Sequence, residues 1–161
     1  ELDPDLIILT HRTYDDAFRL PFVGADDRVV EPDSPDYEQF LRRTSLAALS
    51  ELSRDGREIV IIEPIPPSPS GEDPLSCLSE GNPAEKCSYE AQRTPTPLEL
   101  FYRMEARAPN ITSVDLDRVV CPSWPTCDAI VGRMITRRDG AHMTVTYARS
   151  LASQVGAQIP E

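Results

Sequence analysis

Short, almost entirely apolar runs separated by helical patterns are the feature of this 161-residue sequence that most restricts its fold. Two of these runs, Leu6–Leu9 (LIIL) and Ile59–Ile62 (IVII), are four residues long and rich in β-branched side chains. Their length and composition predict strands buried on both faces, as in a parallel sheet. Thr112–Leu116 predicts a third strand, and Ile130–Thr136 predicts a further short strand or hairpin partner.

Helical patterns fill the intervals between the first three strands. Ser34 and Pro35 are a typical N-cap and first helical residue, and Gly56 is a typical stop, so they bound a first predicted helix. Its predicted inward face comprises Tyr37, Phe40, Leu41, Thr44, Ala48 and Leu52. Pro97 begins a second predicted helix, which ends before Pro109 and turns Leu98, Phe101 and Tyr102 inward.

The last predicted helix begins after Thr144, a typical N-cap residue. Its predicted inward residues are Val145, Ala148, Ala152 and Val155. Residues 15–35 are acidic and irregular. The order strand, helix, strand, helix, strand, short strand, helix predicts an α/β fold with a mainly parallel sheet and helices on its faces.

Charge and length exclude some classes of protein. The formal net charge is -11, and no cluster of Lys and Arg is present, which argues against binding to nucleic acid. The length predicts one domain over residues 1–161. Neither a signal peptide nor a run of eighteen apolar residues occurs.

Four cysteines lie in two polar, Pro-rich segments. Their proximity in sequence favours the pairs Cys77–Cys87 and Cys121–Cys127, each closing a short loop. The alternative is a zinc site, but no C-x-x-C pair occurs and the histidines lack metal-ligand spacing from the cysteines. Disulfides would imply an oxidising compartment outside the cytoplasm. The first pair would staple a Pro-rich insertion at about residues 64–96, which we expect to be an ordered insertion or lid.

Polar side chains follow several of the predicted strands. They include residues 10–14, Glu63, Asp115 and the pair Asp139 and His142. Because ligands bind beyond the carboxyl ends of parallel strands, this convergence predicts a site there. A histidine can act as a general base when a carboxylate fixes its tautomer and stabilises its charged form. The spacing D-x-x-H is a weak signal, and a surface aspartate beside a helix-start histidine is the alternative.

The run SVDLDRVVCPSWPTC…RRDGAHMTVTYARSLA carries a family resemblance. It resembles the end of an SGNH-type hydrolase domain, of the kind fused to bacterial membrane acyltransferase type-three (O-acetyltransferase) proteins. The matching positions are Asp115, Cys121-Pro122, Cys127, Asp139 and His142. The resemblance implies a three-layer, flavodoxin-like sandwich, and it extends loosely over the rest of the chain.

The family's nucleophile is the serine of a Gly-Asp-Ser turn, which this sequence lacks. If the resemblance holds, the chain begins at about the family's third strand, and the fold lacks its first strands. We then expect the edge of Leu6–Leu9 to be exposed.

The resemblance implies acyl transfer by a Ser-His-Asp mechanism on a cell-envelope glycan or glycolipid, without a cofactor. His142 would be the base, Asp139 would hold it, and Arg12 would stabilise the oxyanion or bind substrate; a salt bridge to Asp15 or Asp16 is the alternative for Arg12. The partners would be the acylated substrate and a membrane acyltransferase domain of the same polypeptide, on the extracytoplasmic side. A non-catalytic SGNH-like module that binds a glycan or a partner is the alternative function.

Overall fold

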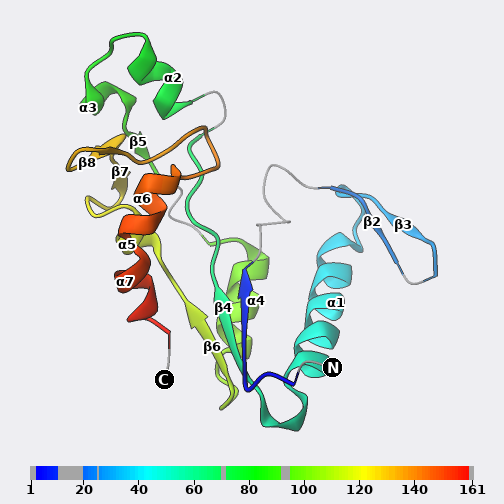
Figure 1. Cartoon of the computed structure of the whole chain (residues 1–161). Coiled ribbons are helices and arrows are strands. Elements are labelled where there is room, and N and C mark those ends of the chain that lie inside the picture. Colours follow the sequence, from blue (N-terminus) through cyan, green and yellow to red (C-terminus); the bar gives the residue numbers. More distant parts are fainter. Residues whose placement is uncertain (1–2, 11–19, 25, 70–71, 92–94, 160–161) are drawn as a thin grey trace. The chain divides into compact units, whose positions relative to one another are not determined.

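A computed structural model of the chain describes residues 3–10, 20–24, 26–69, 72–91 and 95–159 (Figure 1). These residues fall into two compact units. Unit 1 comprises residues 1–64 and 95–114, and unit 2 comprises residues 65–94 and 115–161. That the whole chain is a single domain stays a prediction. Among the described helices, none has the length and apolar character needed to cross a membrane.

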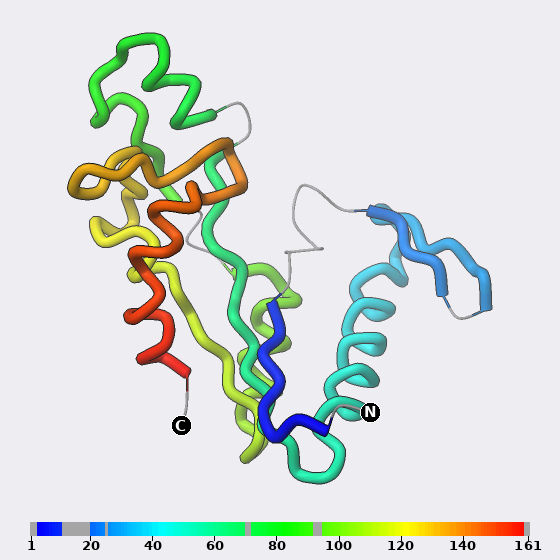
Figure 2. The backbone as a smooth tube through the Cα atoms, viewed as in Figure 1, coloured from blue at the N-terminus to red at the C-terminus, as the bar shows by residue number. Residues whose placement is uncertain are grey.

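Unit 1 is built on a parallel sheet of three strands. The strands β1 (Leu6–Thr10), β4 (Glu58–Ile62) and β6 (Ile111–Val114) lie in the order β1-β4-β6. In the register of the sheet, Ile8 pairs with Val60, and Val60 pairs with Thr112. The backbone trace shows the three strands side by side (Figure 2). The predicted α/β fold with a parallel sheet is confirmed.

Two helices, α1 (Tyr37–Leu52) and α4 (Pro97–Glu105), pack on one face of this sheet. Their apolar side chains form one core with the alternate residues of the strands. The buried members of that core are Val30, Tyr37, Leu41, Leu49, Ile59, Ile61, Leu98, Phe101 and Ile111. Burial of this apolar surface stabilises unit 1, because each large side chain removed from water contributes about 1.5–3 kcal/mol.

The helix starts follow different signals. For α4 the prediction is confirmed: Pro97 is its first residue, and Thr96 and Glu99 form a reciprocal capping box. For α1 the predicted start is two residues early, because Ser34 accepts a hydrogen bond from the backbone N of Asp36 and closes a turn before the helix. The predicted inward residues Thr44 and Ala48 are exposed, and Leu49 is buried instead.

Strand β1 is correctly predicted as a strand, but the prediction that both of its faces are buried is wrong. Leu6 and Ile8 are 40% and 47% exposed, whereas Ile7 and Leu9 pack against the core. The strand is therefore covered on one face only. Among the described strands β1 pairs with β4 alone, so it forms an edge of the sheet, as expected.

A small hairpin precedes α1, in a stretch predicted to be irregular. The strands β2 (Phe22–Val23) and β3 (Val29–Val30) pair antiparallel. Val30 is buried in the unit 1 core. Such two-residue strands carry too little periodicity to be found from sequence.

Unit 2 contains short elements joined by tight turns. They are α2 (Pro74–Ser79), α3 (Ala84–Cys87), β5 (Tyr89–Glu90), α5 (Asp117–Val120), β7 (Thr126–Cys127), β8 (Ile130–Val131), β9 (Met134–Ile135), α6 (Val145–Ser150) and α7 (Ala152–Gly156). The predicted strand Ile130–Thr136 is wrong as a single strand. It is a hairpin of β8 and β9, turned at Gly132, whose φ of 62° favours glycine.

Both predicted disulfides are present, and each lies within unit 2. Cys77–Cys87 joins α2 to α3, and Cys121–Cys127 closes the loop before β8. The strands β5 and β7 then pair Tyr89 with Cys127. Residues 65–94 and the C-terminal region therefore belong to the same unit, while an insertion or lid at about residues 64–96 stays a prediction.

The predicted inward face of the last helix is wrong. Val145 is 66% exposed, while Tyr147 and Leu151 are buried. The Tyr147 hydroxyl donates a hydrogen bond of 2.8 Å to the backbone oxygen of Val120, and the helix divides into α6 and α7 at Leu151. A tyrosine that buries its ring while satisfying its hydroxyl explains the rotated face.

Glu63, one of the predicted strand-end polar groups, follows β4 and is buried. Its carboxylate accepts hydrogen bonds from Arg103 Nε at 3.0 Å and from Ser113 Oγ at 2.7 Å. These contacts join β4, β6 and α4 within unit 1. Glu63 therefore has a structural role in fixing the helix on the sheet.

Replacing Arg103 with Met should lower the free energy of unfolding by about 2–4 kcal/mol, because a buried carboxylate loses its cation. The Arg103 side chain is 39% exposed, so we expect a smaller loss of stability than for a fully buried ion pair. Urea denaturation measures the change. Arg54→Met, which breaks the exposed pair with Glu51, is the control and should cost about 0.5 kcal/mol or less. Equal losses in the two variants would contradict the role of Glu63.

Candidate active site

The turn that carries Asp139 and His142 joins β9 to α6 in unit 2. Two backbone contacts close its base: Arg138 N donates to His142 O at 2.9 Å, and Thr144 N donates to Thr136 O at 3.0 Å. Thr144 then caps α6, because its hydroxyl accepts a hydrogen bond from Tyr147 N. The predicted cap is confirmed, and it places the turn directly before the last helices.

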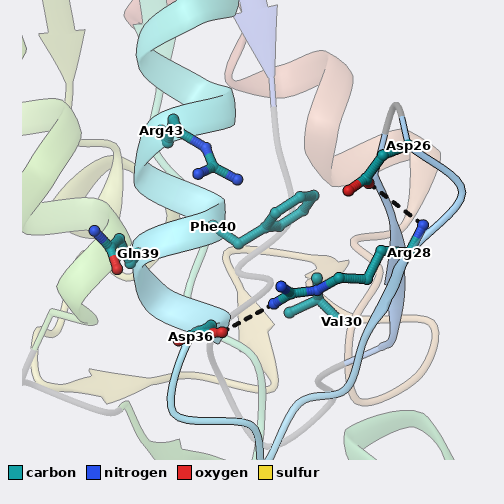
Figure 3. A pocket seen from close by; sticks show the side chains of 7 residues that line it. All are labelled: Asp26, Arg28, Val30, Asp36, Gln39, Phe40 and Arg43. Carbon is teal, nitrogen blue, oxygen red and sulfur yellow. Dashed lines mark hydrogen bonds and ion pairs between the residues drawn. The ribbon is translucent and has the colours of Figure 1, made fainter.

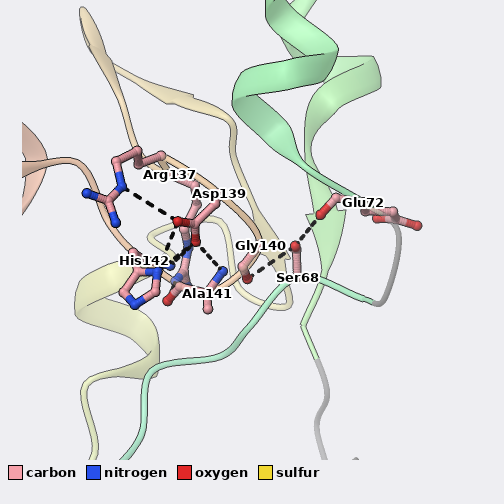
Figure 4. Close-up of polar contacts among 8 residues, drawn as sticks. Ser68, Glu72, Arg137, Asp139, Gly140, Ala141 and His142 are labelled. Atoms are coloured by element: carbon pink, nitrogen blue, oxygen red, sulfur yellow. Dashed lines mark hydrogen bonds and ion pairs between the residues drawn. The ribbon is translucent and has the colours of Figure 1, made fainter. Parts of the chain in front are cut away.

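The Asp139 carboxylate organises the turn (Figure 4). Its Oδ1 accepts hydrogen bonds from the backbone N of Ala141 at 2.9 Å and from the backbone N of His142 at 2.8 Å. The His142 ring lies against the same carboxylate, with Nδ1 2.9 Å from Oδ1 and 3.0 Å from Oδ2. One side chain thus fixes both the backbone of the turn and the histidine ring.

These donors lower the pKa of Asp139 far below its usual value. The largest cause is the hydrogen bond from the backbone of Ala141, followed by that from the backbone of His142; the His142 side chain adds to both. Arg138 Nε also lies 3.6 Å from Oδ2. Asp139 is therefore a carboxylate, and not an acid, at neutral and mildly acidic pH.

The charged carboxylate determines which ring nitrogen of a neutral His142 carries the proton. Because Asp139 can only accept, Nδ1 donates to it, and Nε2 keeps its lone pair. Nε2 points away from Asp139 (Figure 4), and the His142 side chain is 66% exposed. This arrangement can take a proton from a hydroxyl group outside the turn. The structure brings the two predicted residues together, while their catalytic roles stay predictions.

A serine that the sequence analysis did not single out supports the turn from the stapled segment. The backbone N of Ser68 donates to Gly140 O at 2.8 Å, and Ser68 Oγ lies 3.2 Å from the same oxygen. Ser68 Oγ also donates to Glu72 O (Figure 4). Ser68 is buried and its hydroxyl is bound to backbone oxygens, so it holds the turn and is not a free nucleophile.

Arg137 ties the same two segments together from within the unit. Its side chain is 2% exposed; Nη1 donates to Ala141 O at 3.1 Å, and Nη2 donates to Pro66 O. Its guanidinium carbon lies 5.8 Å from the centre of the Tyr89 ring, and the Tyr89 hydroxyl also donates to Pro66 O. Burial raises the pKa of Tyr89, although the Arg137 charge opposes this shift. Arg137 is thus a buried cation that orients the turn through backbone oxygens.

Neither Ser68 nor Arg137 has a sequence pattern that predicts its role in holding the turn. Ser68 stands between two prolines in a long loop, and Arg137 is the first residue of a charged run that indicates a solvated surface. Their roles depend on contacts between residues about seventy positions apart.

The remaining predicted site residues lie in other parts of the chain. His11 and Arg12 lie outside the described residues. Asp115 Oδ1 accepts a hydrogen bond from Asp117 N at the start of α5. Glu63 lies in unit 1, whereas Asp139 and His142 lie in unit 2, so the predicted convergence of strand-end groups stays a prediction.

Metal binding finds no support in the part of the chain that the structure describes. No group of three or more His, Cys, Asp or Glu side chains there could hold an ion. All four cysteines are in disulfides, so the zinc alternative for them is wrong.

Replacing Gly140 with Ala should lower the free energy of unfolding by about 1–2 kcal/mol. The added Cβ would lie 3.0 Å from Ser68 Oγ and 3.4 Å from Glu72 O. Ser68→Ala alone should cost about 1 kcal/mol. The double variant should lose less than the sum of the two, by about 0.5 kcal/mol or more, because the contact with Oγ is gone.

Denaturant unfolding of the four proteins in this cycle measures the coupling. Gly156→Ala is the matched control: among the described residues, no atom outside its own stretch of helix lies within 4 Å of the added Cβ, so its stability should not fall. Strict additivity of Gly140→Ala and Ser68→Ala would contradict the contact.

Comparison with known proteins identifies a family for the chain. Neither the curated proteins nor the solved structures compared with the chain provided a match. One family model does match, and it covers residues 1–157. Its description is SGNH domain (fused to AT3 domains). Because that model spans nearly the whole chain, the protein belongs to the family of SGNH domains that are fused to AT3 domains.

Proposed function

We propose that this domain takes part in acyl-ester chemistry, transferring or hydrolysing an acetyl or similar short acyl group by a Ser-His-Asp mechanism. The observation that carries the proposal is the contact between His142 Nδ1 and the Asp139 carboxylate. It leaves the exposed Nε2 as the base. A histidine held in this way by a carboxylate is the part of a catalytic triad that moves the proton.

The proposed reaction has two steps. In the first, a serine hydroxyl attacks the acyl carbonyl carbon while His142 Nε2 takes the serine proton; the tetrahedral intermediate then breaks its C–O bond, and His142 returns that proton to the departing alcohol. In the second step, a water or sugar hydroxyl attacks the acyl-serine and loses its proton to His142; the bond between the acyl carbon and the serine oxygen then breaks, and His142 returns the proton to that oxygen. Asp139 stays ionised and stabilises the imidazolium that forms in each step.

The serine of this mechanism is proposed to lie outside the 161 residues. The sequence contains no Gly-Asp-Ser. Among the described residues, the hydrogen bonds of His142 go to Asp139 and to the backbone of the turn, and no serine hydroxyl contacts its ring. We therefore propose that this chain supplies the base and its carboxylate, and that on its own it has negligible esterase activity.

The remaining elements of the proposal are the oxyanion group, the substrate and the location. Arg12 is the proposed oxyanion or substrate-binding group, on sequence grounds only. The proposed substrate is an acylated cell-envelope glycan or glycolipid, and the proposed partner is an acyltransferase domain of the same polypeptide. The two disulfides are consistent with an extracytoplasmic position, which the proposal adopts.

Substitution of His142 tests the proposal in the complete polypeptide that carries this domain. His142→Ala should reduce turnover of p-nitrophenyl acetate by about 10²–10⁴-fold, the usual contribution of a positioned general base. Asp139→Asn should lower it by a similar factor, because an amide can stabilise the wrong tautomer of the ring. Gln154→Ala, an exposed change in α7, should leave the rate unaltered.

The outcome separates this proposal from a non-catalytic role. Equal rates for the wild type, His142→Ala and Asp139→Asn would remove the catalytic assignment and favour a binding module. Thermal unfolding of each variant, followed beside the assay, distinguishes lost chemistry from lost folding.

A further inference from the structure

A second candidate site lies in unit 1, on the face of α1 that looks toward the β2–β3 hairpin (Figure 3). There a cavity of about 170 Å³ lies between the helix and the hairpin. It is lined by Asp26, Arg28, Val30, Asp36, Gln39, Phe40 and Arg43. The lining residues of the helix recur at positions 36, 39, 40 and 43, so they form one continuous face.

A larger hollow adjoins the first one on the same helix. It encloses about 670 Å³, and its apolar lining comes from Leu46 and Phe101. Gln39 and Arg43 line both hollows and so form the ridge between them. A ligand of two linked units could occupy both hollows with its linkage over this ridge.

Charges of both signs surround the two hollows. In the first, Asp26 and Asp36 face Arg28 and Arg43. In the second, Glu38 and Glu105 lie beside Arg42 and Arg43. Because Arg43 lines both hollows, the four carboxylates and three guanidinium groups of the combined surface leave a net charge of -1. An anionic ligand would gain no overall attraction there, so the site favours an uncharged ligand over an anionic one.

Two exposed arginine side chains on the helix each lie over an aromatic ring. The guanidinium carbon of Arg42 lies 5.5 Å from the centre of the Phe101 ring, and that of Arg43 lies 5.9 Å from the centre of the Phe40 ring. Within the described part of the chain, neither guanidinium has a carboxylate within ion-pair distance. A donor held in place by an aromatic ring loses little entropy when it binds a ligand.

Acceptors come from the hairpin and the start of the helix. Arg28 Nη2 donates to Asp36 Oδ2 at 2.9 Å, which leaves the other carboxylate oxygen, Oδ1, as an acceptor. Asp26 Oδ1 accepts from the backbone N of Arg28 at 3.3 Å. Gly24 lets the Asp26 side chain occupy this position, because an added Cβ would lie 2.6 Å from Asp26 Oδ1.

We propose that these two hollows form a binding site for two consecutive sugar units of an uncharged glycan. Pyranose rings combine apolar C–H faces with hydroxyls that both donate and accept hydrogen bonds. The hollows offer the matching set: apolar surface from Val30, Phe40 and Leu46, with guanidinium, amide and carboxylate groups at the rim. The site is made of unit 1 residues, whereas Asp139 and His142 belong to unit 2, and sugar binding in these hollows does not require a catalytic His142.

Binding of defined disaccharides to the chain tests the proposal. The probes are maltose, cellobiose, lactose and N,N′-diacetylchitobiose, with digalacturonate as the charged comparison. Saturation-transfer NMR detects binding, and backbone amide shifts locate it. At least one neutral disaccharide should bind with a Kd of about 1 mM and shift the amides of residues 26–46. Digalacturonate should bind at least about tenfold more weakly.

Arg43→Ala should weaken binding of the neutral disaccharide about tenfold, because the ridge loses a charged hydrogen-bond donor that lines both hollows. Arg43→Lys keeps the charge but loses the planar guanidinium group. Its affinity for the disaccharide should therefore lie between those of the wild type and Arg43→Ala. Glu51→Gln, at the exposed last turn of α1 and outside both hollows, is the matched control. His142→Ala should leave binding unaltered, so failure of the catalytic proposal is distinguishable from failure of this one.

Three results would overturn the sugar site. They are no binding of any neutral disaccharide up to about 50 mM, stronger binding of digalacturonate, or equal binding by the wild type and Arg43→Ala. Thermal unfolding of each variant confirms that it is folded before binding is compared.

Discussion

The carboxylate of Asp139 is the group on which the geometry of the candidate active site depends. It accepts hydrogen bonds from two backbone N–H groups and from the His142 ring, and it pairs with Arg138. The backbone bonds keep the aspartate charged, and the charge in turn fixes the histidine tautomer. The proposed base and its orienting group thus lie within four consecutive residues of one turn.

Such a short turn keeps its shape only when the rest of the unit supports it. Two backbone oxygens of the turn, those of Gly140 and Ala141, are bound by Ser68 and Arg137. Arg137 also binds Pro66 O, so the disulfide-stapled segment and the C-terminal region hold the turn jointly. The sequence predicts this stapled segment to be an insertion or lid. Its first residues, Pro66 and Ser68, help to hold the turn of the candidate site.

The sequence was sufficient to predict the features that depend on local pattern. The strands β1 and β4, the start of α4 at Pro97 and the cap at Thr144 each follow from short-range chemistry, and the disulfides follow from proximity. Features that depend on tertiary contacts were missed or misread. The helix after Thr144 turns Tyr147 inward because a distant carbonyl accepts a hydrogen bond from its hydroxyl. Arg137 is buried because its guanidinium donates hydrogen bonds to the backbone oxygens of nearby Ala141 and of remote Pro66. No periodicity within either segment encodes these partners.

The central claim is that Asp139 holds His142 as a base with its free nitrogen directed outward. The most direct test is the ¹⁵N chemical shifts of the His142 ring at alkaline pH, where the imidazole is neutral, in the wild type and in Asp139→Asn. The account predicts a single tautomer in the wild type, with the proton on Nδ1 and Nε2 unprotonated, and loss of that preference in Asp139→Asn. A wild-type ring that carries its proton on Nε2, or the same tautomer mixture in both proteins, would contradict it.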